Sequence, residues 1–108
     1  MKDDRLYLLL VLESIERIRS YVHGGEPAFM DSPLIQDAVL RNLHTLAEST
    51  QRLSSEFREQ HPDVPWRRIA GLRNVIVHGY LGVDLAAIWR IVEKDLPELE
   101  RQLRAADE

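Results

Sequence analysis

The amino-acid sequence predicts an all-α fold with antiparallel helices. Apolar residues recur at spacings of three and four over most of the chain, which is the period of helices that bury one face. No segment combines sustained alternation, β-branched enrichment and hairpin turn residues, so strands are not expected. The predicted loops are short, and short loops favour antiparallel neighbours.

The first predicted helix begins at Asp3 and Asp4 and ends before Gly24. Acidic residues at the start interact favourably with the helix dipole, while His23 and the pair Gly24-Gly25 are typical of a helix end. Its apolar face consists of Leu8, Val11, Leu12, Ile15, Ile18 and Val22.

A second helix is predicted from Pro33 to Gln60. Ser32 is a typical N-cap, Pro33 suits the first helical position, and no further glycine or proline precedes Gln60. A helix of roughly 27 residues would extend about 40 Å, whereas a domain of about 100 residues has a radius of gyration of about 13 Å. The length favours a homodimer that covers the protruding surface; the alternative is that the helix ends are solvated. The apolar stripe consists of Ile35, Val39, Leu43, Leu46, Leu53 and Phe57.

Two further helices are predicted in the second half of the chain. Pro65 opens the third helix, which is expected to end at Gly79 and Gly82 because glycine readily adopts the left-handed geometry of helix ends. Asp84 is the predicted cap of the fourth helix. Pro97 lacks an N–H, so we expect a kink there or a new short helix after it. The apolar positions of these helices are Ile69, Leu72, Ile76, Leu85, Ile88, Trp89 and Val92.

Length and composition restrict the class of protein. A chain of 108 residues without linkers or repeats predicts one domain over residues 1–108. A hydrophobic content of 44%, with five glycines and five prolines, excludes collagen-like and disordered chains. The longest apolar run, residues 6–12, is too short for a membrane span, and the acidic N-terminus is unlike a signal peptide. We therefore expect a soluble, cytoplasmic protein without a membrane partner.

The sequence gives no indication of a metal or a cofactor. It contains no cysteine, which excludes disulfides, thiol nucleophiles and thiolate metal sites. The four histidines are too far apart in sequence for a helical metal-binding pair, and no glycine-rich phosphate loop is present. His23, His44 and His61 occupy a helix end, the flank of an apolar stripe and a polar loop, so we expect none of them to be catalytic.

A short segment with several polar side chains stands out from this background. The net charge is −4, which gives no overall attraction to nucleic acid, but no acid lies between Asp63 and Asp84. This stretch contains Arg67, Arg68 and Arg73. Residues 73–80 also include Asn74, His78 and Tyr80.

The spacing of Arg73 and His78 allows two interpretations. Residues five apart on a helix are separated by about 140° around its axis. The two side chains face one target only if the helix ends near Val77 and the chain turns at Gly79. In the alternative, this is an ordinary helix end at which Arg73 is solvated and His78 interacts with terminal carbonyls.

The arrangement Arg73-Asn74-x-x-x-His78 resembles the Arg-x4-6-His signature of the HEPN superfamily of helical ribonucleases and nucleotide-binding domains. The longer strings at 65–66 and 72–80 resemble the HepT-like toxin family within it, as do residues 83–85, 88–92 and 95–99. On the second helix, residues 41–43 and Glu48 match another stretch of the family, although Ala47-Glu48-Ser49 departs from its usual Gly-Glu-Ala. The resemblance covers roughly residues 3–104.

This resemblance implies a single HepT-like HEPN domain, folded as a bundle of four to five helices. It also implies a homodimer in which both copies of the motif line one cleft. The implied activity is that of a metal-independent endoribonuclease toxin, encoded beside a minimal nucleotidyltransferase antitoxin. Arg73, His78 and Tyr80 complete the family's Arg-x4-His-x-Tyr pattern, and the antitoxin is expected to transfer AMP to Tyr80. A tyrosine whose ring packs against the bundle is the alternative.

The residue types agree with RNA cleavage. Without a metal, the 2′-hydroxyl of RNA attacks the adjacent phosphorus, which requires a proton acceptor and stabilisation of negative charge. Histidine, with an ordinary pKa of about 6.5, serves as base or acid near neutral pH, and arginine offers paired donors to phosphate oxygens. His78 and Arg73 are therefore the predicted catalytic residues.

Several neighbours are candidates for supporting roles. Asn74 either positions the phosphate or His78, or caps the helix. Arg67 and Arg68 are candidates for holding the RNA backbone. Glu48 either orients Arg73 or pairs with a neighbouring base such as Arg52.

The sequence also allows other interpretations of its aromatic residues and of its function. Trp66 and Trp89 are expected in the core rather than as base-stacking platforms. The alternative functions are a non-catalytic nucleotide- or RNA-binding HEPN bundle and a structural adaptor.

Overall fold

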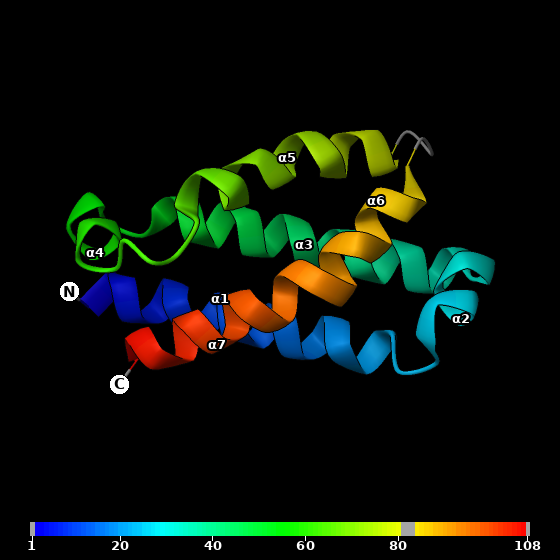
Figure 1. The fold of residues 1–108 in the computed structure, drawn as a ribbon, viewed down its shortest axis with the longest axis horizontal. Coiled ribbons are helices and arrows are strands. Elements are labelled where there is room, and N and C mark those ends of the chain that lie inside the picture. Colours follow the sequence, from blue (N-terminus) through cyan, green and yellow to red (C-terminus); the bar gives the residue numbers. More distant parts are fainter. Residues whose placement is uncertain (1, 81–83, 108) are drawn as a thin grey trace.

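The protein is represented by a computed structural model that describes residues 2–80 and 84–107; for residues 2 and 77–80 it describes the backbone alone. Figure 1 shows long helical segments arranged side by side, and the molecule measures 41 × 24 × 20 Å. Two short helices lie in the connections. In chain order the elements are α1 (Lys2–Tyr21), α2 (Gly25–Asp31), α3 (Pro33–Arg52), α4 (Ser55–Gln60), α5 (Trp66–Tyr80), α6 (Leu85–Arg90), the π-helix η1 (Ile91–Asp95) and α7 (Leu96–Asp107).

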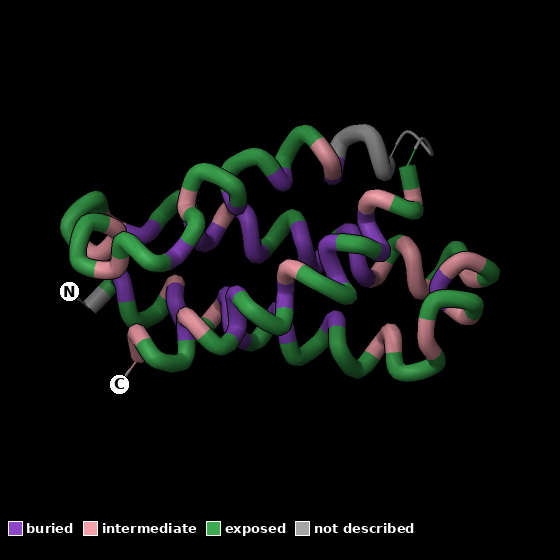
Figure 2. The backbone as a smooth tube through the Cα atoms, in the orientation of Figure 1, coloured by how far each residue is buried: buried purple, intermediate pink, exposed green. Residues whose placement is uncertain are grey.

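The predicted all-α bundle is confirmed, with no strand among the described residues. α1 and α3 run antiparallel and form the most extensive contact of the bundle, and α5 packs against α3. The last segment, α6 to α7, crosses from α5 and α2 towards α1. Figure 2 shows that buried residues lie on the inner sides of these segments. The fully buried side chains include Val11, Phe29, Val39, Leu43, Leu46, Ile88 and Leu103.

The predicted helix from Pro33 to Gln60 is wrong, because the chain breaks it between α3 and α4. Leu53 and Ser54 have extended backbones, with ψ of 141° and 156°. The carboxylate of Asp4 on α1 accepts hydrogen bonds from both the backbone N–H and the hydroxyl of Ser54, each at 2.7 Å. The hydroxyl of Ser54 in turn accepts from the N–H of Phe57 and caps α4. A contact with a residue fifty positions away thus ends the helix, and α3 has 20 residues. The length argument for a homodimer no longer applies.

Two predicted helix caps are confirmed. The hydroxyl of Ser32 accepts a hydrogen bond from the N–H of Ile35 at 3.1 Å, with Pro33 in the first turn. The carboxylate of Asp84 accepts from the N–H of Ala87 at 2.9 Å. Helix α2 was not predicted. It begins at Gly25, whose φ of +83° is accessible mainly to glycine.

The third helix ends at Tyr80, between the two glycines predicted to end it, but the chain does not turn at Gly79. α5 continues through Gly79 to Tyr80, and Gly82 lies outside the described residues. A glycine inside a helix costs only about 1 kcal/mol relative to alanine, which the surrounding turns can offset. Positions 73 and 78 therefore lie on one continuous helix, about 140° apart around its axis.

The predicted interruption at Pro97 takes the form of the π-helix η1, which directly precedes α7. The N–H of Leu96 donates to the carbonyl of Ile91, five residues earlier. The wider turn redistributes the hydrogen bonds next to a proline that cannot donate one.

Ion pairs join the last helix, α7, to α1 and bring the two ends of the chain together. The termini lie at one end of the molecule, where Arg5 and Asp107 are 3.1 Å apart (Figure 1). The buried carboxylate of Glu100 on α7 pairs with Arg19 of α1 and with Arg104, which also reaches Glu16. None of the described helices has the length and apolar character that crossing a membrane requires.

Candidate functional site

Arg73 is held on the surface of α5 by two side chains of α3. One terminal nitrogen of its guanidinium, NH2, lies 2.8 Å from Oε1 of Glu48, and the other, NH1, donates to Oε1 of Gln51 at 2.9 Å. The side chain of Arg73 is 50% exposed, so the guanidinium is both anchored and accessible. Of the two roles considered for Glu48, the contact with Arg73 is the one that the structure contains.

Gln51 was not singled out by the sequence. A neutral glutamine on a helix surface carries no chemical signature of its own. The available signal was its spacing, because residues three apart share a helix face and Gln51 is three residues after Glu48.

The three arginines of the predicted basic patch do not converge. Arg73 faces α3, whereas Arg68 lies on the opposite edge of α5 and pairs with Asp95 of η1 at 3.0 Å. Arg67 is exposed, and no partner for its side chain is found among the described residues. Of the three arginines, Arg68 and Arg73 each form an ion pair with a carboxylate of a neighbouring segment.

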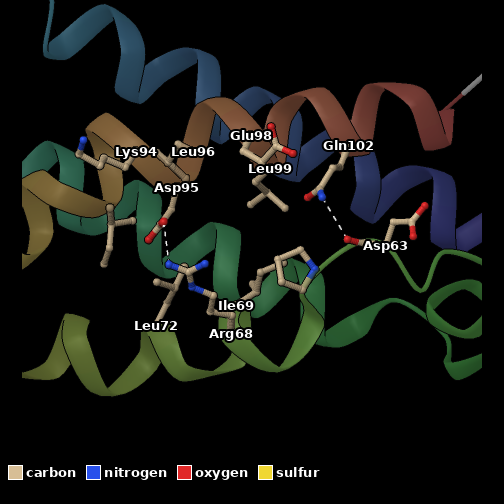
Figure 3. A pocket seen from close by; sticks show the side chains of 12 residues that line it. Asp63, Arg68, Ile69, Leu72, Lys94, Asp95, Leu96, Glu98, Leu99 and Gln102 are labelled. Atoms are coloured by element: carbon tan, nitrogen blue, oxygen red, sulfur yellow. Dashed lines mark hydrogen bonds and ion pairs between the residues drawn. The ribbon is translucent and has the colours of Figure 1, made fainter.

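The edge of α5 that carries Arg68 faces a cavity of about 380 Å³ between α5 and the η1–α7 segment (Figure 3). The pair Arg68–Asp95 spans it at one side, and Nε2 of Gln102 donates to the carbonyl of Asp63 at the other. Arg73 is not among its lining residues. The cavity and the candidate site are therefore separate features. The apolar walls of the cavity are formed by Pro65, Ile69, Leu72, Ile91, Leu96 and Leu99.

Asn74 is exposed in the interior of α5, so the alternative in which it caps the helix is excluded. The side chains of His78 and Tyr80 lie outside the described residues, although their backbones belong to α5. Helical register still relates these positions. Position 78 follows Asn74 by four residues, and position 80 follows Arg73 by seven, so each pair shares a helix face.

Both tryptophans have structural contacts, as expected. Trp89 is buried against Phe29, with ring centroids 5.4 Å apart. Trp66 is half-buried, and its indole N–H donates to the carbonyls of Arg58 and His61 at 3.1 and 3.0 Å. These contacts stabilise the bundle and the turn before α5.

The remaining histidines lie apart from Arg73 or on the surface. His61 packs its ring against Phe57 with a centroid distance of 4.5 Å, while His23 and His44 are exposed. In the part of the chain that the structure describes, no three His, Cys, Asp or Glu residues are grouped so that they could hold a metal ion.

Comparison with known proteins identifies a family that covers most of the chain. The model of the family described as "Ribonuclease HepT-like" matches residues 11–106. A protein of Caldanaerobacter subterraneus subsp. tengcongensis named "Putative RNase" is 38% identical over 96% of this chain and 94% of its own length. The "Probable ribonuclease HepT" of Thermococcus cleftensis is 34% identical over 87% of this chain and 86% of its own.

A longer relative from Methanocaldococcus jannaschii is named "Gamma-glutamylcyclotransferase and putative RNase". It is 39% identical over 94% of this chain, which spans only 46% of that relative's length. No solved structure matches this chain.

Proposed function

This chain belongs to the HepT-like ribonuclease family, and from that premise we propose that it is a metal-independent endoribonuclease whose catalytic residues are Arg73 and His78. The observation that carries the proposal is Arg73 itself, an accessible guanidinium anchored by α3 on the helix that also contains His78. We treat residues 1–108 as one HepT-like domain.

The reaction uses a nucleophile that RNA supplies. His78 accepts the proton of the 2′-hydroxyl, whose oxygen bonds to the adjacent phosphorus, and the bond from phosphorus to the 5′-oxygen breaks. The departing 5′-oxygen takes a proton from water, which leaves a 2′,3′-cyclic phosphate and a 5′-hydroxyl. Arg73 stabilises the negative charge that develops on the phosphoryl oxygens. Asn74 and Arg67 position the phosphate and the RNA backbone, and Arg68 contributes to that role only after leaving Asp95.

The argument for a homodimer from helix length no longer applies, but the helix register supports a homodimer. Positions 73 and 78 of one protomer point about 140° apart along α5. Two copies in one cleft allow Arg73 of one protomer to act with His78 of the other. The active unit is therefore a dimer with composite sites.

The biological role that fits this activity is that of a cytoplasmic toxin controlled by a minimal nucleotidyltransferase antitoxin, which transfers AMP to Tyr80. Position 80 lies two helical turns beyond Arg73 on the same face of α5. An AMP phosphodiester on Tyr80 would add a negative charge on the helix face that carries Arg73 and compete with the RNA phosphate.

The decisive experiment is RNA cleavage by the purified protein. Wild type should cut RNA in the presence of a chelator and leave cyclic or 2′/3′-phosphate ends, whereas Arg73→Ala and His78→Ala should reduce cleavage at least about a hundredfold. Circular dichroism should show that both variants stay helical. Chelator-sensitive cleavage, or full activity of His78→Ala with contaminating nucleases excluded, would contradict this mechanism. Retention of RNA binding without cleavage would instead favour a non-catalytic binding protein.

A further inference from the structure

Arg73 has two partners on α3, and they differ in charge. One terminal nitrogen of the guanidinium forms an ion pair with Glu48 at 2.8 Å, and the other donates a hydrogen bond to Gln51 at 2.9 Å. Because arginine has only donors, the atom of Gln51 that faces it must be the amide oxygen. An arginine has five N–H donors, so donors other than the one bound to Gln51 are left for a phosphate.

Two anchoring points constrain the guanidinium more than one does. A guanidinium held at a single nitrogen can pivot about that contact and rotate around its long, flexible side chain. When one terminal nitrogen is hydrogen-bonded and the other is ion-paired, by residues three apart on one helix, the rotation of the group is restricted. A donor that is already oriented does not have to reorganise during the reaction.

The absence of charge on Gln51 also affects how strongly the site attracts RNA. Glu48 offsets the positive charge of Arg73, so the pair presents little net charge to RNA. A second carboxylate at position 51 would make the group negative and repel phosphate, whereas the amide of Gln51 orients Arg73 without reducing its charge further.

From these contacts we infer that Gln51 is a positioning residue for RNA cleavage, which fixes the guanidinium of Arg73 while preserving its attraction for phosphate. This inference rests on the ribonuclease activity proposed above. If Gln51 positions Arg73, loss of its hydrogen bond and addition of a charge at position 51 should have different effects on RNA cleavage.

The first test is a comparison of kcat and KM for Gln51→Leu, Gln51→Glu and wild type on one RNA oligonucleotide. Gln51→Leu loses the acceptor, so kcat should fall by about 10- to 100-fold with little change in KM. Gln51→Glu keeps an acceptor, so kcat should stay within about threefold of wild type. Its KM should rise about tenfold at low salt and approach the wild-type value as salt screens the added charge.

The matched control is Gln60→Leu, which makes the same substitution at an exposed glutamine of α4. It should leave kcat and KM unchanged. Wild-type kinetics for Gln51→Leu, or an equal loss in Gln60→Leu, would overturn the assignment.

The second test does not depend on activity. In the wild-type protein with 15N-labelled arginine, the two terminal nitrogens of Arg73 should give resolved NMR signals, because their exchange by rotation is slowed. Gln51→Leu should merge these signals, and Gln51→Glu should keep them apart. A wild type that does not cleave RNA would refute the proposed function and with it the catalytic role of Gln51. Signals unchanged in Gln51→Leu would refute the positioning itself.

Discussion

Arg73 shows how much of a candidate active site depends on residues that do no chemistry. Its guanidinium is half-exposed, yet two of its nitrogens are occupied by Glu48 and Gln51. Arg68, five residues earlier, is occupied by Asp95 on the other edge of α5. A charge count along the sequence treats these arginines as equivalent, whereas the structure directs Arg73 towards α3 and Arg68 towards η1.

Tyr80 is the residue to which we expect the antitoxin to transfer AMP. Co-expression with a cognate nucleotidyltransferase should abolish toxicity of the wild type, and mass spectrometry should find one or more AMP groups on Tyr80. Tyr80→Phe removes the accepting hydroxyl, so this variant should keep its fold and its cleavage and remain toxic beside the antitoxin. Equal silencing of Tyr80→Phe and wild type, without an adduct on either, would mean that inhibition comes from binding alone.

At the scale of elements, the break between α3 and α4 is determined by a single carboxylate on α1. Asp4 is 6% exposed and accepts two hydrogen bonds from Ser54. These bonds lower the pKa of Asp4 below its ordinary value, first through the backbone N–H of Ser54 and then through its hydroxyl. Because Ser54 also caps α4, the charge on Asp4 supports the start of that helix.

Asp4→Asn should therefore lower the free energy of unfolding by about 1–3 kcal/mol near neutral pH. The folded-state pKa is the lower one, so the contribution of the carboxylate is complete above the unfolded value of 3.8 and is lost as the pH falls through the folded value. Urea unfolding of wild type and variant should thus show a difference that is constant near neutral pH and disappears in acid. Asp3→Asn, at the exposed neighbouring position, is the control. A difference that persists after Asp4 is protonated would show that the charge is not responsible.

In the bundle as a whole, the candidate motif lies on one long helix, and its two proposed catalytic positions do not share a face. α5 is continuous through position 80, so the separation of about 140° between positions 73 and 78 is built into the protomer. The intramolecular ion pairs fix α7 and the termini to α1, on the other side of the bundle. The proposed composite site would be completed by a second copy of the chain.

We expect light scattering at micromolar concentration to give about twice the protomer mass of 12.5 kDa. Composite sites also predict complementation between inactive variants. A mixture of equal parts Arg73→Ala and His78→Ala, allowed to exchange protomers, should recover about a quarter of wild-type activity, because half of the dimers then contain one intact site. A monomer that cleaves RNA, or a mixed dimer with no activity, would contradict the composite site.

Local signals in the sequence were enough to predict much of this protein. The periodicity of apolar residues predicted the helices, and the caps at Ser32 and Asp84 were correct because a cap depends on the residues immediately beside it. The spacing of Arg73 and His78 within strings typical of one family likewise predicted the family. These features depend on neighbours in the chain, so the chain alone determines them.

The tertiary structure decided the features that depend on distant residues. The residues around Leu53 and Ser54 are compatible with a helix, and only the approach of Asp4 on α1 makes an extended turn more favourable there. Gln51 has no recognisable signature until α5 packs against α3 and places Arg73 within hydrogen-bonding distance. Hydrogen bonds and ion pairs act over a few ångströms, so which polar groups meet is decided by the packing of the helices and not by their order in the sequence.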